Sequence, residues 1–158
     1  YRLTREFLEI NPNDPAISLL LFKYGMARLS QFETPELISD FQGFKDKYGE
    51  FEGSLVINYF LGLSHLTEEN HQIALDLFEK VIASSNTRFR PDAIFRKAIC
   101  VMGLDRLDEA RDQLLRFVAD YPQNVLRPQA ELVLGNLVNL LGDSEAALEH
   151  YYLIEAYS

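Results

Sequence analysis

A period of 36 or 37 residues runs through this sequence and constrains its fold more than any other feature. A small residue recurs inside an apolar run at separations of 37, 36 and 37 residues: Gly25, Gly62, Ala98 and Gly135. Twelve residues later come Leu37, Ala74, Ala110 and Ala147, and four residues beyond these come Phe41, Phe78, Leu114 and Tyr151. Self-similarity at such a period predicts an array of repeated supersecondary units.

Each copy is predicted to form two helices. The first is apolar almost all round in segments 17–29, 55–66, 93–102 and 132–141, so it must be covered on most sides. The second is amphipathic, as in segment 108–120, where Leu114 and Phe117 stand among charged residues. The sequence shows no alternation of apolar and polar residues with a period of two, which is the pattern expected of a strand. The sequence therefore predicts an all-α fold of antiparallel helix pairs.

Helix-start signals divide the chain into repeats. Proline is tolerated in the first helical turn, and the predicted helix starts carry Pro15, Pro35, Pro91 and Pro128. Candidate N-cap residues are Asp14, Thr34, Asp105 and Asp143. We expect a single array over residues 1–158 with repeats at 15–50, 53–88, 91–124 and 128–158. Residues 1–12 are predicted to be the second helix of a preceding repeat.

The pattern resembles the tetratricopeptide repeat (TPR), and nearly the whole chain takes part. The best copy is Asp92–Pro122, in which Ala98, Ala110, Phe117 and Pro122 stand where the family has small, small, bulky and proline residues. The family's early Trp is absent, and its first-helix Tyr is replaced by Arg28, His65, Val101 and Val138. The resemblance implies a right-handed superhelical solenoid.

The length of the period adds a second resemblance. A period of 36 or 37 residues exceeds the 34 of the standard motif, and the best copy ends in Asp-Tyr-Pro at residues 120–122. Both features are similar to the variant found in bacterial cell-envelope TPR proteins. This likeness implies the periplasm or the cell envelope rather than the cytoplasm.

Composition excludes several classes of partner. The chain has 15 basic and 24 acidic residues and a net charge of −9, which disfavours a surface that follows nucleic-acid phosphates. The longest apolar stretch, around residues 19–22, is far shorter than the roughly 20 residues that cross a bilayer. We therefore expect neither a nucleic-acid partner nor a membrane span.

No group of residues predicts catalysis. Glycine-rich phosphate loops, metalloprotease helices and nucleophile elbows are absent from the sequence. His65 and His71 flank a predicted turn at a spacing that does not place them on one helical face. Cys100 occupies a position where a small apolar residue is wanted, which favours a packed thiol. The sequence predicts a protein that is not an enzyme, with no cofactor and no metal.

A stripe along the first helices is the strongest candidate site. In the TPR family these helices line the concave side, and the residues predicted to face inward follow at intervals of three or four. The predicted rows are Leu19, Phe22, Met26 and Leu29; Val56, Tyr59, Leu63 and Leu66; Asp92, Phe95, Ile99 and Met102; and Gln129, Leu132, Asn136 and Asn139. One interpretation is packing between neighbouring first helices. The other is an exposed groove for a peptide or an amphipathic helix.

From the second interpretation we expect a scaffold that binds a protein or peptide partner. The predicted contact residues are Phe22, Met26, Tyr59, Leu63, Phe95, Ile99, Met102 and Asn136. An alternative function is self-assembly, in which terminal helices pair between chains as a homo-oligomer. The last predicted helix motivates it, because solenoid ends normally carry a polar cap whereas this helix contains Tyr151, Tyr152, Ile154 and Tyr157.

Overall fold

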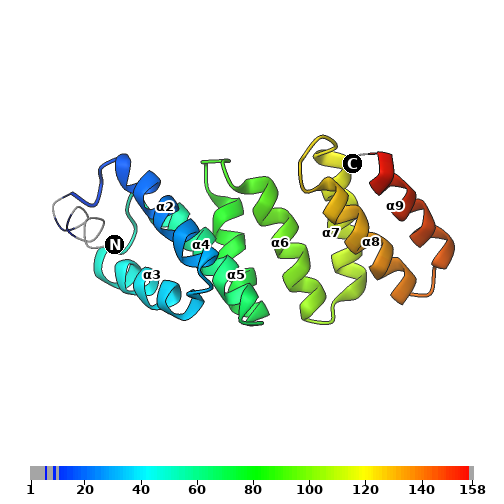
Figure 1. Cartoon of the computed structure of the whole chain (residues 1–158), viewed down its shortest axis with the longest axis horizontal. Helices are drawn as coiled ribbons and strands as arrows, with labels where there is room; N and C mark the ends of the chain where they lie inside the picture. Colours follow the sequence, from blue (N-terminus) through cyan, green and yellow to red (C-terminus); the bar gives the residue numbers. More distant parts are fainter. Residues whose placement is uncertain (1–5, 7–8, 10, 157–158) are drawn as a thin grey trace. The chain divides into compact units, whose positions relative to one another are not determined.

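The computed structural model describes residues 6, 9 and 11–156, and within these ranges all regular structure is α-helical. The chain divides into two compact units, which are residues 1–86 and residues 87–158. Unit 1 contains α2 (Ala16–Ser30), α3 (Thr34–Tyr48), α4 (Ser54–Thr67) and α5 (His71–Ala83). Unit 2 contains α6 (Arg90–Gly103), α7 (Leu107–Asp120), α8 (Arg127–Leu140) and α9 (Ser144–Ala156) (Figure 1). The predicted all-α architecture is confirmed.

Helices that follow one another in the sequence pack together within each unit. In unit 1, α3 and α5 both pack on α4, and α2 contacts both α3 and α4. In unit 2, α7 packs on α6 and on α8, and α9 packs on α8 (Figure 1). The core consists of apolar residues from facing helices, with Phe41, Phe60 and Phe78 in unit 1 and Phe95 and Phe117 in unit 2 all almost fully buried.

The recurring small residue lets an aromatic ring approach the helix backbone. A Cβ at Gly25 would stand 2.6 Å from the ring of Phe60, and a Cβ at Gly62 would stand 2.8 Å from the ring of Phe78. A Cβ at Gly135 would collide with the ring of Tyr151. Such distances are far inside van der Waals contact, so larger residues at these positions would displace core rings.

The turn inside each helix pair also follows the repeat. Residues with positive φ occur seven positions after each small residue: Phe32, Glu69, Asp105 and Gly142. The left-handed conformation reverses the chain between the two helices, and Gly is the residue that adopts it without steric cost. In three of the four repeats, a residue other than Gly therefore adopts this strained backbone conformation at the turn.

One of the four N-cap predictions is confirmed, because Asp143 Oδ1 accepts a hydrogen bond from the Ala146 amide at 2.9 Å. Asp14 Oδ1 accepts a hydrogen bond from the Ala16 amide at 2.8 Å, but the N-cap residue of α2 is Pro15. The prediction for Asp105 is wrong, because this residue is the left-handed turn residue after α6. Thr34 is instead the first residue of α3.

The predicted repeat ranges stay a prediction. Helices α2 and α3 lie inside range 15–50, and α4 and α5 lie inside range 53–88. Helices α6 and α8 each begin one residue before the predicted ranges 91–124 and 128–158. The helix expected in residues 1–12 lies largely outside the described residues.

No helix among the described residues is both long enough and apolar enough to cross a bilayer.

Candidate functional site

The predicted stripe in unit 1 begins on an exposed face of α2. Leu19 is 49% exposed and Met26 is 51% exposed, although both are large apolar residues. Half-buried Phe22 lies between them at helical spacing, so the three side chains share one face. The Phe22 ring meets the ring of Phe60 edge-on, with centroids 5.6 Å apart. The base of this face is therefore part of the core, while its rim reaches solvent.

Helix α4 supplies the neighbouring part of the same face. Tyr59 packs edge-on against Phe60 with centroids 5.3 Å apart, so Phe22 and Tyr59 both lie against one buried ring. Leu63, four residues after Tyr59, is also half-buried. The structure thus places two of the predicted contact residues, Phe22 and Tyr59, against the same buried ring, while Met26 follows Phe22 by one turn on α2 and Leu63 follows Tyr59 by one turn on α4. We call the surface formed by Leu19, Phe22, Met26, Tyr59 and Leu63 the α2–α4 face.

The predicted contact residues of unit 2 have different environments. Phe95 is 0% exposed and packs on Phe117, with ring centroids 5.7 Å apart. The interpretation of Phe95 as a partner-contacting residue is therefore wrong, because its ring fills the space between α6 and α7. Ile99 and Met102 are half-buried on α6, whereas Asn136 is exposed on α8 and accepts a hydrogen bond from the Tyr151 hydroxyl at 2.8 Å.

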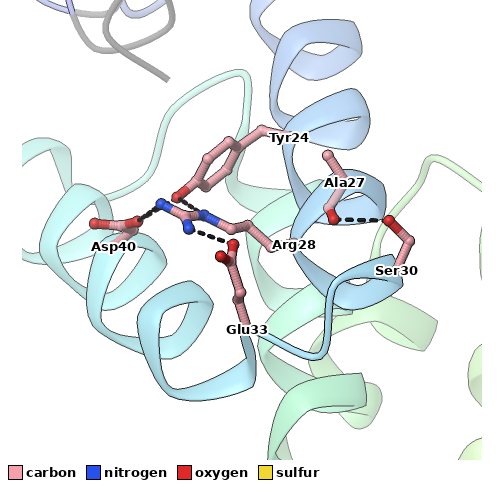
Figure 2. Close-up of polar contacts among 6 residues, drawn as sticks. All are labelled: Tyr24, Ala27, Arg28, Ser30, Glu33 and Asp40. Carbon is pink, nitrogen blue, oxygen red and sulfur yellow. Dashed lines mark hydrogen bonds and ion pairs between the residues drawn. The ribbon is translucent and has the colours of Figure 1, made fainter.

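A polar cluster that the sequence analysis missed joins α2 to α3. Figure 2 shows Tyr24 and Arg28 of α2 facing Asp40 of α3 and Glu33 of the intervening turn. The Tyr24 hydroxyl donates a short hydrogen bond to Asp40, and Arg28 Nε donates to the Tyr24 oxygen at 2.8 Å. Arg28 also forms a close ion pair with Glu33 and lies 3.7 Å from Asp40.

The electrostatics of this cluster indicate a structural clamp. Burial, together with the hydrogen bond to Asp40, raises the pKa of Tyr24 above its ordinary value. The hydrogen bonds of Arg28 to Glu33 and Tyr24 raise the pKa of the guanidinium. Both shifts favour the protonated forms that donate these bonds. The cluster therefore fixes the α2–α3 pair.

A second polar cluster lies between α8 and α9. Glu131 of α8 is 1% exposed, and its Oε2 lies 2.7 Å from Nδ1 of His150 on α9. Its other oxygen lies 3.4 Å from Nε of Arg127, one helical turn earlier. A buried carboxylate requires such partners, because desolvation penalises an unpaired charge.

Two of the buried polar residues in the first helices occupy the same repeat position. Asn58 and Glu131 each stand four residues before the small residue of their repeat, where the other copies have Leu21 and Ile94. Asn58 is buried and accepts a hydrogen bond from Lys45 Nζ at 3.1 Å. A polar residue inside an otherwise apolar helix is visible in the sequence and could have identified both positions.

The residues considered for chemistry do not converge. Within the described residues, no three His, Cys, Asp or Glu side chains come together as a metal site. His65 lies on α4 and half-buried His71 begins α5, and burial lowers the pKa of His65. Cys100 is buried, which raises the pKa of its thiol to about 11. The prediction of a packed thiol is confirmed.

Comparison with solved structures shows what this arrangement resembles. MamA from Desulfovibrio magneticus RS-1 is 18% identical with a TM-score of 0.76, and the match covers 99% of this chain and 82% of that chain. The fold is that of the tetratricopeptide repeat. A crystal structure of MamA is 16% identical, with a TM-score of 0.74 and coverage of 99% and 85%.

A third solved structure supports the same TPR fold. It is a putative kinesin light chain from Podospora anserina with nearly identical TPR-like repeats, 16% identical with a TM-score of 0.71. The match covers 99% of this chain and 84% of that chain. No protein-family description matches the chain. No curated protein sequence matches it either.

Proposed function

We propose that this TPR-fold chain is a non-enzymatic scaffold that binds an apolar segment of another protein, either an amphipathic helix or an extended peptide. The observation that carries the proposal is the exposure of Leu19 and Met26 at helical spacing on α2. Exposed apolar residues mark an interaction site when they form a contiguous patch, and these two side chains share one face of α2 with Phe22 between them. Kinesin light chain and MamA structures share the fold.

The construction of the α2–α4 face supports this function. The rings of Phe22 and Tyr59 both lie against Phe60, so the floor of the face is packed on the core. Met26 at its rim is flexible and polarisable, which suits contact with varied apolar side chains. A floor that is already packed in the free chain lowers the entropy lost when a segment binds, and the flexible rim lets the face fit different side chains.

A displayed library of random peptides tests the proposal. Panning against the chain is expected to enrich apolar or amphipathic sequences whose binding is lost in a Leu19→Glu/Met26→Glu variant. Ile73→Glu is the matched control, because Ile73 on α5 is also 49% exposed but lies outside the α2–α4 face. Equal binding to both variants would show that the face is not the site.

A second candidate function is self-assembly through α9. Leu148 and Tyr152 lie four residues apart on this helix and are 54% and 70% exposed. Tyr151 instead lies over Gly135, and Ile154 is half-buried. Tyr157, the last aromatic of the proposed surface, is outside the described residues. Exposed apolar residues that share one helix face in this way favour pairing between chains.

Light scattering across a concentration series separates the two functions. Self-assembly predicts a mass that rises with protein concentration and returns to that of a monomer in a Leu148→Glu/Tyr152→Glu variant. A mass independent of concentration at micromolar levels would exclude self-assembly. The same result would not contradict the proposal that a peptide binds at the α2–α4 face.

The proposal includes a cell-envelope setting. Its support is the period of 36 or 37 residues together with the Asp-Tyr-Pro sequence at 120–122, which are similar to envelope TPR proteins. Fractionation of the source cells, with detection of the full-length protein by antibody, tests this setting. Recovery in the cytoplasmic fraction alone would contradict it.

A further inference from the structure

Helix α9 carries an exposed stripe in which acidic and apolar residues alternate. The stripe consists of Glu145, Leu148, Glu149, Tyr152 and Leu153, each three or four residues from another member, so their side chains share one side of the helix. All five are exposed, and the exposed fractions of Leu148 and Tyr152 are 54% and 70%. We call these five residues the α9 stripe.

The α9 stripe occupies repeat positions that face solvent in earlier repeats. Although α4 packs on α3 and α8 packs on α7, the positions equivalent to Glu145, Glu149, Tyr152 and Leu153 stay exposed there, as Pro35, Ser39, Gln42 and Gly43 in α3 and as Asp108, Asp112, Leu115 and Arg116 in α7. Only the position of Leu148 varies, since its equivalent Leu75 in α5 is buried. A helix stacked on α9 in the manner of the repeat would therefore leave most of the stripe open.

In α7 the acidic residues of this side are neutralised by an arginine of the same helix. Arg111 forms ion pairs with Asp108 at 2.9 Å and with Asp112 at 3.1 Å. Helix α9 keeps both acidic residues one repeat later, as Glu145 and Glu149. The two helices can thus be compared position by position.

The arginines of α7 are replaced by leucines in the α9 stripe. Leu148 stands where α7 has Arg111, and Leu153 stands where it has Arg116. The sequence after Arg127 contains neither Lys nor Arg. Among the described residues, no basic side chain lies within 4.0 Å of either carboxylate of the stripe. The stripe therefore presents two carboxylates without counter-ions beside three exposed apolar side chains.

We propose that the α9 stripe binds a basic amphipathic helix of another protein. Apolar side chains of that helix would cover Leu148, Tyr152 and Leu153, and its Lys or Arg residues would supply the positive charge that Glu145 and Glu149 lack. The stripe uses no residue of the α2–α4 face, so this binding does not depend on the peptide binding proposed there.

A second copy of this chain is a poorer occupant of the α9 stripe. Two α9 helices pairing through their stripes would place acidic residues of one copy beside those of the other, and like charges across an interface oppose association. Helix α9 contains three glutamates and neither Lys nor Arg to offset them. The charges therefore favour a basic partner over self-assembly through α9.

Fluorescence anisotropy with a labelled, designed peptide tests the proposal. The peptide forms an amphipathic helix of about five turns with Leu on one side and Lys on the other, and a matched peptide has Glu in place of Lys. The full chain carries Leu19→Ser/Met26→Ser, so that peptide bound at the α2–α4 face does not contribute. The Lys peptide should bind saturably and at least about tenfold more tightly than the Glu peptide.

Removal of the two carboxylates tests the charge contribution. Glu145→Gln/Glu149→Gln should weaken binding of the Lys peptide about three- to tenfold and make it less sensitive to salt. The matched control is Asp108→Asn/Asp112→Asn, which changes the net charge equally at the equivalent positions of α7. These carboxylates are already paired with Arg111, so affinity should be unchanged.

A substitution at the centre of the stripe completes the test. Leu148→Arg recreates the charge pattern of α7 and should abolish binding of the Lys peptide, whereas Leu148→Met should retain it. Absence of saturable binding, equal affinity for the two peptides, or unchanged affinity in folded Glu145→Gln/Glu149→Gln would overturn the proposal. It would also be overturned by a dimer, seen in light scattering, that Leu148→Arg dissociates and that excludes the Lys peptide, because the stripe would then belong to a second copy.

Discussion

His150 and Glu131 form a hydrogen-bonded pair across α8 and α9, with 2.7 Å between Nδ1 and Oε2, and the carboxylate is only 1% exposed. The neighbouring Arg127 is at 3.4 Å from the other oxygen. Removal of His150 would leave the carboxylate with one weak partner. The pair therefore predicts that unit 2 is sensitive to substitution of His150 on α9.

We expect His150→Leu to lower the free energy of unfolding by about 1–3 kcal/mol, the usual cost of a buried polar group without its partner. Urea denaturation followed by circular dichroism measures the loss. In Glu131→Leu/His150→Leu most of the loss should be recovered, because Leu21 and Leu77 already occupy the equivalent positions in other repeats. A double variant less stable than the single variant would contradict this account.

The left-handed turns predict a substitution that increases stability. Phe32 has φ +59° and is 91% exposed, so its conformation is strained while its ring packs on nothing that would be lost. Phe32→Gly should raise the free energy of unfolding by about 1 kcal/mol, since Gly adopts this conformation without the steric cost. Thermal unfolding of the purified variant measures the gain.

Gly142 is the matched control for Phe32, because it occupies the same turn position with φ +98°. A Cβ at Gly142 would meet no atom within 4 Å, so Gly142→Ala tests the backbone alone. It should lose about 1 kcal/mol. If Phe32→Gly is destabilising while Gly142→Ala is neutral, strain is not what distinguishes these turns.

Much of the fold follows from the sequence because the repeat supplies four independent copies of the same signal. Apolar periodicity and proline position locate the helices, and the small residue marks the closest helix contacts. The left-handed residue at Phe32, Glu69 and Asp105 carries no comparable signal, since only Gly142 has the residue type expected there. Position within the repeat, rather than residue identity, determines that conformation.

The candidate site was less predictable for a physical reason. In a helix that is apolar almost all round, spacing alone does not distinguish an exposed residue from a buried one. Met26 and Phe95 thus belong to one predicted stripe but are 51% and 0% exposed. Buried polar residues such as Glu131 could be found in the sequence, whereas its partner 19 residues away depends on how α8 and α9 pack.

Two glycines of unit 1 predict opposite responses to the same substitution. Gly62→Ala should lose about 1–3 kcal/mol of unfolding free energy, because the new Cβ would stand 2.8 Å from the ring of buried Phe78. Gly43 lies inside α3, and a Cβ there meets no atom within 4 Å. Gly43→Ala should therefore gain about 0.5–1 kcal/mol from higher helix propensity. Chemical denaturation of both variants compares the two sites. Equal changes in the free energy of unfolding would contradict this account.

Cys100 predicts how the native chain responds to thiol reagents and to alkali. Burial raises its pKa to about 11, so at pH 8 only about one thiol in a thousand is ionised. A disulfide reagent such as DTNB should label the folded chain at a small fraction of the rate seen in urea, because the thiolate is the reactive form. Rapid labelling of the folded chain at pH 8 would contradict the buried environment.

The same pKa shift has a defined sign for stability. The folded-state pKa of Cys100 lies above the value of about 8.5 for an unfolded thiol, so the neutral form is favoured by folding. This contribution is fully present below about pH 8.5 and is lost as the pH rises toward 11. Burial raises the pKa of Tyr24 as well, so its loss of stability extends to higher pH. Comparing the free energy of unfolding of Cys100→Ala with that of the parent chain between pH 8 and pH 11 isolates the thiol contribution. The tyrosine effect is common to both chains, so only the parent should lose the additional stability that comes from the neutral thiol.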